Sequence, residues 1–258
     1  MEFKDIEFSY DNKNLIIKNQ SFTFNKNEIT SIIGPNGCGK TTLLNLLCKQ
    51  YKSTSGVIYL NNKEINKYKG KEFAKEVASV YQINDSINDI TVESLVSYGR
   101  VPHKSNFSLL NDEDYEIINN ALERTALTDF KNKKICNMSG GERQRVYIAL
   151  ALCQEPSILF LDEPTSFLDM YYQQEVLNIL KKINLEKKIT VIMVLHDVNQ
   201  ALLYSDNIII MKDGEIKEFG PAKDVITKDI IKEIYNVNSE ILTDSSGVKH
   251  FIPIYNLI

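Results

Sequence analysis

The segment from Gly34 to Thr42, GPNGCGKTT, constrains the chain more than any other. It fits the pattern G-x-x-x-x-G-K-[ST] of a phosphate-binding loop. It follows the apolar run Ile29–Ile33 and precedes leucines at helical spacing, and a strand, a glycine-rich loop and a helix in this order begin a βαβ unit. Glycines let the backbone N–H groups converge on phosphate oxygens, and the helix start adds its positive end. An α/β protein with a nucleotide site is therefore predicted, and its binding residues are Gly34, Pro35, Asn36, Gly37, Cys38, Gly39, Lys40, Thr41 and Thr42.

A pair of carboxylates supplies the second part of the predicted site. The apolar run Ile158–Leu161 reads as a buried strand, and Asp162 and Glu163 follow it directly. Ligands of open α/β sheets bind at the carboxyl ends of the strands. We expect Asp162 and the Thr41 hydroxyl to hold Mg²⁺, Lys40 to reach the β- and γ-phosphates, and Glu163 to act as the general base for the attacking water. Alone, the carboxylate pair could simply cap a helix; beside a phosphate loop it favours catalysis.

The length of 258 residues suits one large α/β domain that carries an inserted lobe. Residues 1–85 and 156–220 are predicted to form the α/β core, and its first part alternates like an antiparallel sheet. Asp213-Gly214, between the apolar run Asn207–Met211 and Glu215–Phe219, predicts a hairpin with a tight turn. Residues 86–155 have helical periodicity and are predicted to form a helical subdomain, with one apolar face made by Tyr115, Ile118, Leu122 and Leu127. Residues 221–258 are predicted to form a C-terminal helix, from about Asp224 to Tyr235, and a short β-tail.

Composition limits the partners. A net charge of −4 gives no electrostatic reason to expect nucleic acid as a partner. No apolar run approaches the roughly 18–20 residues that cross a bilayer, and the acidic start reads as a strand and not as a signal peptide. The expected location is the cytoplasm, and any membrane association is expected to come through a partner.

A third motif, Met138–Arg145 (MSGGERQR), precedes an apolar helical stretch. It resembles the LSGGQ-type signature of ATP-binding-cassette ATPases, with Met in place of Leu and Glu142 in place of Gln. Ser139 and the Gly140 and Gly141 amides stand at a helix start, which is an anion site. A plain Ser-Gly-Gly helix cap would look the same in isolation. The resemblance implies that four residues contact the nucleotide of a partner subunit: Ser139, Gly140, Gly141 and Glu142.

Four further positions match the same family in its chain order. Gln82 resembles the Q-loop glutamine near Mg²⁺ and the water, and Ser166–Asp169 (SFLD) resembles the D-loop, with Asp169 at the dimer interface. His196 resembles the switch histidine that senses the γ-phosphate, and Tyr10 resembles the aromatic platform that stacks on adenine. The family implies an ATP hydrolase with a RecA-like P-loop NTPase core. That core has a mostly parallel sheet, an N-terminal antiparallel β part and an inserted α-helical subdomain.

Within the family, Tyr98–His103 (YGRVPH) and Leu195–Ala201 (LHDVNQA) resemble importers of ferric siderophores, haem and cobalamin. Such a subunit works as a homodimer beneath two integral-membrane permeases, peripheral to the cytoplasmic side of a bacterial membrane. An extracellular substrate-binding protein supplies the cargo. We expect the lobe from Ser86 to Glu155, including Arg100–His103, to hold the groove for a permease helix.

Two other classes remain as alternatives. One is a cytosolic, non-transport cassette ATPase for DNA repair, chromosome structure or cluster assembly; such proteins usually carry coiled-coil insertions, zinc modules or basic surfaces. The other is a non-hydrolytic, nucleotide-gated scaffold, against which the predicted base Glu163 argues. The choice among siderophore, haem and cobalamin stays open, because these subunits do not touch the cargo.

Overall fold

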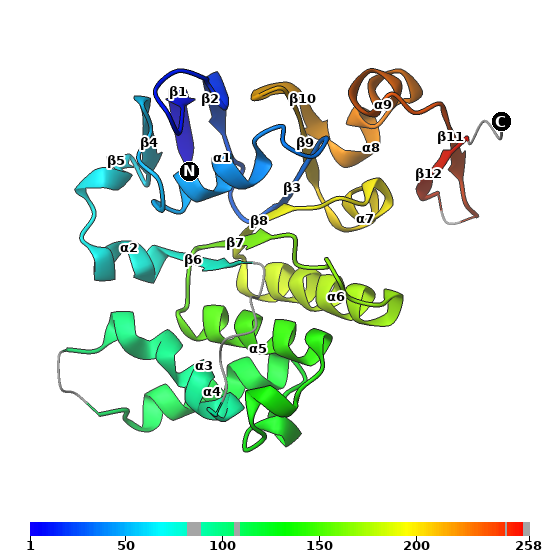
Figure 1. Cartoon of the computed structure of the whole chain (residues 1–258). Coiled ribbons are helices and arrows are strands. Elements are labelled where there is room, and N and C mark those ends of the chain that lie inside the picture. Colours follow the sequence, from blue (N-terminus) through cyan, green and yellow to red (C-terminus); the bar gives the residue numbers. More distant parts are fainter. Residues whose placement is uncertain (82–88, 106–108, 246, 255–258) are drawn as a thin grey trace. The chain divides into compact units, whose positions relative to one another are not determined.

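The computed structural model describes residues 1–81, 89–105, 109–245 and 247–254. The chain divides into two compact units (Figure 1). Unit 1 comprises Met1–Ile65 and Ile192–Ile258, and unit 2 comprises Asn66–Val191. Within the described ranges, no helix is long and apolar enough to span a membrane.

Unit 1 opens with a four-stranded antiparallel sheet. Its order is β2-β1-β4-β5, and the strands are β1 (Glu2–Phe8), β2 (Ile17–Thr23), β4 (Ser55–Leu60) and β5 (Lys63–Glu64). Phe3, Ile6 and Phe8 are buried; Ile6 and Phe8 keep the two-residue spacing of one strand face, and an irregularity at Asp5, with φ of 50°, interrupts that spacing between Phe3 and Ile6. The predicted antiparallel β part is confirmed.

The second sheet of unit 1 carries the predicted phosphate loop. Its strands run in the order β10 (Glu215–Pro221), β9 (Asn207–Lys212), β3 (Ile29–Ile33) and β8 (Thr190–Val194), and β8 belongs to unit 1 from Ile192 onward. β3 and β9 are parallel, and all five residues of β3 are buried, as is typical of a strand covered on both faces. Asp213 and Gly214, with φ of 52° and 83°, make the predicted tight turn between β9 and β10.

The helices of unit 1 are α1 (Lys40–Leu47), α7 (Val198–Tyr204), α8 (Ala222–Val225) and α9 (Lys228–Tyr235). The predicted single helix over about 224–235 is therefore wrong in part. Thr227 is the N-cap of α9 and accepts a hydrogen bond from the N–H of Ile230, so the helix is interrupted between α8 and α9. The tail is a hairpin of β11 (Ser239–Thr243) and β12 (Lys249–Pro253).

Unit 2 contains the strands β6 (Val77–Val80) and β7 (Ile158–Asp162), which are parallel and follow β8 in the order β8-β7-β6. Its helices are α2 (Gly70–Glu76), α3 (Val92–Ser97), α4 (Asp112–Arg124), α5 (Gly140–Cys153) and α6 (Met170–Lys187), with 3₁₀ turns η2 (Tyr98–His103), η3 (Thr128–Phe130) and η4 (Ile135–Asn137). α3, α4 and α5 pack on one another within the stretch predicted to be helical. Tyr115, predicted on their apolar face, is exposed, whereas Ile118 and Leu122 are buried. The mostly parallel α/β architecture is confirmed.

Candidate functional site

The phosphate loop has the geometry that its glycines predict. Gly39, with φ of 104°, is the N-cap of α1, and Lys40 is the first residue of that helix. Gly34 has φ of 151°, and a Cβ there would lie 2.1 Å from the carbonyl oxygen of Met211. Only glycine fits this approach of the loop to β9. The loop therefore curls between β3 and the positive end of α1.

Lys40 is the charged group inside this curl. Its side chain is buried, at 5% exposure, and its Nζ donates hydrogen bonds of 2.9 Å to the carbonyl oxygens of Gly34 and Pro35. An ammonium group carries three donors, so it can keep both bonds and still meet a phosphate oxygen. The loop thus holds a positive charge where an anion would be bound.

Tyr10 lies beside the loop, with its hydroxyl 3.1 Å from Oγ1 of Thr42. Its exposed ring packs edge-on against Phe8 and Tyr51, at centroid distances of 4.9 and 5.6 Å. Tyr51 in turn stacks on Phe8 at 5.4 Å. This aromatic group offers an exposed face to a planar base. Tyr51 is absent from the predicted site, because it follows α1 without a recognisable motif.

His196 follows β8 in unit 1. The N–H of Leu195 donates to the carbonyl oxygen of Ile32 on β3, so β8 is bonded up to the residue before the histidine. His196 is exposed, and Asp197 after it is the N-cap of α7. The ring therefore projects from a short loop fixed at both ends.

Asp162 and Glu163 stand at the end of β7 in unit 2. Asp162 is buried, and Glu163 has φ of 51°. A left-handed backbone at a non-glycine residue costs about 1–3 kcal/mol, and such residues cluster at functional sites. Oγ of Ser166 donates a 2.9 Å hydrogen bond to Oε2 of Glu163 and fixes its carboxylate. We had not predicted this contact, although Ser166 lies in the segment that resembles the D-loop.

The signature residues form the N-terminus of α5. Ser139 is the N-cap: its Oγ accepts from the N–H of Glu142, and its own N–H donates to Oε2 of Glu142 at 2.8 Å. Lys133 places its Nζ 3.4 Å from the same carboxylate oxygen. Burial opposes ionisation of Glu142, but the Ser139 N–H and the Lys133 charge outweigh it and hold the pKa of this carboxyl below its ordinary value. The S-x-x-E spacing of this capping box is readable in the sequence; the Lys133 contact is not.

The predicted site residues are distributed over both units. Unit 1 holds Tyr10, the phosphate loop and His196, and unit 2 holds Asp162, Glu163 and the signature. Asp169 is also in unit 2, as the N-cap of α6 that accepts from the N–H of Tyr172 at 3.1 Å. Gln82 lies outside the described residues. Within unit 1 the structure brings Tyr10 to the phosphate loop, and within unit 2 it brings Ser139 to Glu142.

Comparison with known proteins gives the family. Residues 17–166 match the ABC transporter family. The chain belongs to this family. It is 42% identical over 244 residues to the iron(3+)-hydroxamate import ATP-binding protein FhuC of Bacillus subtilis, which covers 95% of this chain and 91% of that protein. It is 36% identical over 243 residues to the ferric enterobactin transport ATP-binding protein FepC of Escherichia coli, with 94% and 90% covered.

Solved structures agree with this assignment. A chain of a metal-chelate-type ABC transporter in an inward-facing conformation superposes with a TM-score of 0.85 at 26% identity, covering 98% of this chain and 96% of that one. A dimeric bacterial ABC transporter cassette gives a TM-score of 0.72 at 30% identity, covering 86% and 98%. The predicted family, P-loop fold and ATP hydrolase activity are confirmed.

The segment Tyr98–His103 of the ABC ATPase has an internal role that its sequence did not reveal. Arg100 is buried, and it donates to Oδ1 of Asp114 at 3.1 Å, to the carbonyl oxygen of Cys153 at 2.7 Å and to Oε2 of Glu155 at 2.8 Å. His103 Nε2 lies 2.9 Å from the carbonyl oxygen of Gln154. Arg100 therefore ties η2 to α4 and to the end of α5. The exposed side chains of this segment are those of Tyr98 and Val101.

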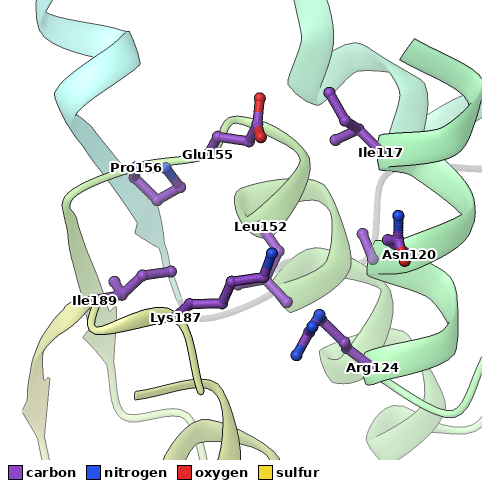
Figure 2. Close-up of a pocket in the computed structure, with 9 residues that line it drawn as sticks. Ile117, Asn120, Arg124, Leu152, Glu155, Pro156, Lys187 and Ile189 are labelled. Atoms are coloured by element: carbon purple, nitrogen blue, oxygen red, sulfur yellow. The ribbon is translucent and has the colours of Figure 1, made fainter. Parts of the chain in front are cut away.

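A cleft of about 330 Å³ lies in unit 2 of the ATPase, where α4, α5 and α6 end (Figure 2). Two of its charged side chains have partners: Arg124 pairs with Glu186, and Glu155 pairs with Arg100. The lining residues are Ile117, Asn120, Ala121, Arg124, Leu152, Glu155, Pro156, Lys187 and Ile189, and none of the predicted site residues is among them.

Proposed function

We propose that this ABC ATPase powers an importer of iron chelates of the ferric-siderophore class. The observation that carries the proposal is the 42% identity to the iron(3+)-hydroxamate import ATP-binding protein, which extends over 95% of this chain. Relatives named for petrobactin import in Bacillus anthracis, at 40% and 37% identity, support the same cargo class. The whole chain is therefore similar to import subunits, and not only its nucleotide motifs.

The phosphate loop, Gly34–Thr42, would bind the ATP phosphates through its N–H groups and Lys40. The Thr41 hydroxyl, the Asp162 carboxylate and the Gln82 amide are hard oxygen donors of the kind that Mg²⁺ prefers, so these side chains would hold the ion. The bound Mg²⁺ would neutralise part of the phosphate charge.

Glu163 would act as the general base in hydrolysis. It would take a proton from the attacking water as the oxygen of that water bonds to the γ-phosphorus and ADP leaves. Ser166 supports this role, because its hydrogen bond orients the carboxylate. His196 would donate a hydrogen bond to the γ-phosphate from its fixed loop, and the exposed ring of Tyr10 would stack on the adenine.

We infer that the ATPase works as a two-fold homodimer in which each signature completes the partner's nucleotide site. Ser139, Gly140, Gly141 and Glu142 begin α5, whose N-terminal N–H groups suit a γ-phosphate. Beside Asp169, the side chains of Phe167, Met170 and Tyr171 are strongly exposed. A second copy would bury this apolar surface, and a similar cassette has been solved as a dimer.

The proposed partners are two integral-membrane permease subunits, contacted from the cytoplasmic side of the membrane, and through them an extracellular substrate-binding protein. Exposed Tyr98 and Val101 on η2, which lies in the predicted lobe, would contact a permease helix. Arg100, predicted to share in this contact, would act only by holding η2 in place.

Transport in cells tests the function. Cells that lack this chain, but keep its permeases, should lose uptake of ⁵⁵Fe-labelled hydroxamate chelates and regain it from a plasmid copy. A copy with Lys40→Ala should express normally and restore nothing. Uptake of labelled haem and cobalamin should not change. If the deletion leaves iron-chelate uptake intact, or removes only haem or cobalamin uptake, the cargo class is wrong. If it removes none of these, the cytosolic alternative gains support.

A further inference from the structure

The loop of His196 is bonded to the start of α7. Oδ1 of Asp197 accepts hydrogen bonds from the N–H groups of Asn199 at 2.7 Å and Gln200 at 3.0 Å. This cap fixes the first turn of α7 directly after the histidine. Any displacement of that turn therefore moves the backbone of His196.

The C-terminal hairpin is bonded to the same turn. The side-chain amide of Asn199 donates from Nδ2 to the carbonyl oxygen of Phe251 at 3.0 Å, and its Oδ1 accepts from the N–H of Phe251 at 2.7 Å. Both backbone groups of this β12 residue thus bond to one side chain, as they would to a neighbouring strand. An amide suits this role because it offers a donor and an acceptor together.

The element before the hairpin reaches the phosphate loop. The hydroxyl of Tyr235, the last residue of α9, lies close to the backbone of Gly34 in the phosphate loop. Burial raises the pKa of Tyr235 above its ordinary value, the nearby Cys38 adds to the rise, and the backbone of Gly34 opposes it. β11 packs on α9, so the hairpin is attached at both ends to parts that border the nucleotide motifs of unit 1.

A cavity of about 350 Å³ lies beside these residues. It is lined by His196, Asp197, Val198, Asn199, Tyr235, Val237, Phe251 and Pro253. The histidine loop and the C-terminal segment both contribute to its lining. Space beside an exposed ring would let the loop shift, and the two bonds at Asn199 oppose such a shift.

We propose that the C-terminal hairpin positions His196 for hydrolysis, and that Asn199 is the positioning residue through which it acts. This rests on the proposed role of His196 at the γ-phosphate. Asn199 does not touch nucleotide in this scheme; it keeps the loop in the orientation that hydrolysis needs. Because the phosphate loop and Tyr10 bind ATP, loss of the hairpin contact should lower kcat and leave ATP affinity unchanged.

The test uses single substitutions in the full chain, with kcat, the Kd for Mg-ATP and the thermal midpoint measured for each. Asn199→Ala removes both bonds and should lower kcat about tenfold, with Kd within about twofold of the parent. Asn199→Asp keeps the acceptor and loses the donor, so its kcat should fall between those of the parent and of Asn199→Ala. Leu203→Ala, at an exposed position of the same helix, should match the parent in all three measurements.

A second variant approaches the contact from the hairpin. Phe251→Pro removes the N–H that donates to Asn199 and should also lower kcat. Combined with Asn199→Ala it should add little, because both changes break the same contact. The proposal is overturned if either single variant keeps the parental kcat, if kcat and ATP affinity fall together, or if the two effects add fully. His196→Ala tests the proposed role of His196 separately from that of the hairpin. If it hydrolyses ATP at the parental rate, the role of His196 is itself wrong. If it is inactive while Asn199→Ala is fully active, only the hairpin proposal fails.

Discussion

Replacement of Arg100 by methionine should destabilise the ATPase rather than act on a partner's binding surface. Methionine keeps much of the side chain's length and loses the charge and all donors. In the parent, the side chains of Arg100 and Asp114 are 6% and 4% exposed and pair at 3.1 Å. Removing one partner of a buried ion pair costs about 3–5 kcal/mol.

The surroundings of the two carboxylates that lose Arg100, Asp114 and Glu155, decide where in that range the cost falls. Asp114 keeps the ammonium of Lys104 and the N–H of Asn111 at 2.9 Å, which compensate part of the loss. Glu155, whose side chain is 52% exposed, returns to water at little cost. We therefore expect a loss near the lower limit, about 3 kcal/mol, from a total stability of about 5–15 kcal/mol.

Urea unfolding followed by circular dichroism measures this loss, and co-purification with the permeases measures docking. Val101→Ala changes an exposed neighbour and should keep the unfolding midpoint while weakening co-purification. Arg100→Met should shift the midpoint strongly. If Arg100→Met unfolds at the parental urea concentration and selectively loses the permease, Arg100 contacts the partner directly and the argument from burial is wrong.

Three further outcomes are expected. Lys40→Ala should abolish tight Mg-ATP binding, because the charge inside the phosphate loop is lost; normal affinity by calorimetry would contradict the loop assignment. Lys133→Met should weaken ATP-driven dimerisation several-fold, because Glu142 would face the phosphates without its cation, and adding Glu142→Gln should restore dimerisation. Analytical sedimentation of both variants with ATP measures this, and a double variant that dimerises no better than Lys133→Met would refute the prediction. Hydrogen bonds from Asn111, Lys104 and Arg100 outweigh burial and hold the pKa of Asp114 at about 2, so its stabilisation is present above pH 4 and is lost as the pH falls towards 2. Acid unfolding of the parent should thus be steeper there than that of Asp114→Asn, and parallel curves would contradict it.

The parts of the site that lie in continuous motifs could be predicted from the sequence. The loop between β3 and α1 follows from glycine spacing, and the turn at Asp213 and Gly214 follows from its dipeptide. The Ser139 cap follows from S-x-x-E. In each case the residues that interact are near neighbours in the chain, so local pattern determines the contact.

Contacts between distant segments could not be predicted in this way. Arg100 meets Asp114 and Cys153 across 14 and 53 residues, and Asn199 meets Phe251 across 52. These pairs depend on how helices pack, for which one sequence has no periodic signal. The break between α8 and α9 was missed because a single Thr cap inside an apolar helical pattern is a weak sign.

ATP turnover and dimerisation of Glu163→Gln test the proposed hydrolysis, because proton transfer is assigned to this one side chain. Glutamine keeps the size of glutamate and its hydrogen-bond acceptor for Ser166 but cannot accept the proton. We expect parental Mg-ATP affinity and a turnover lower by about 10²–10⁴-fold. In size-exclusion chromatography with ATP, the variant should elute as a dimer that still holds its ATP. Turnover at the parental rate, or a monomer in saturating ATP, would contradict these expectations.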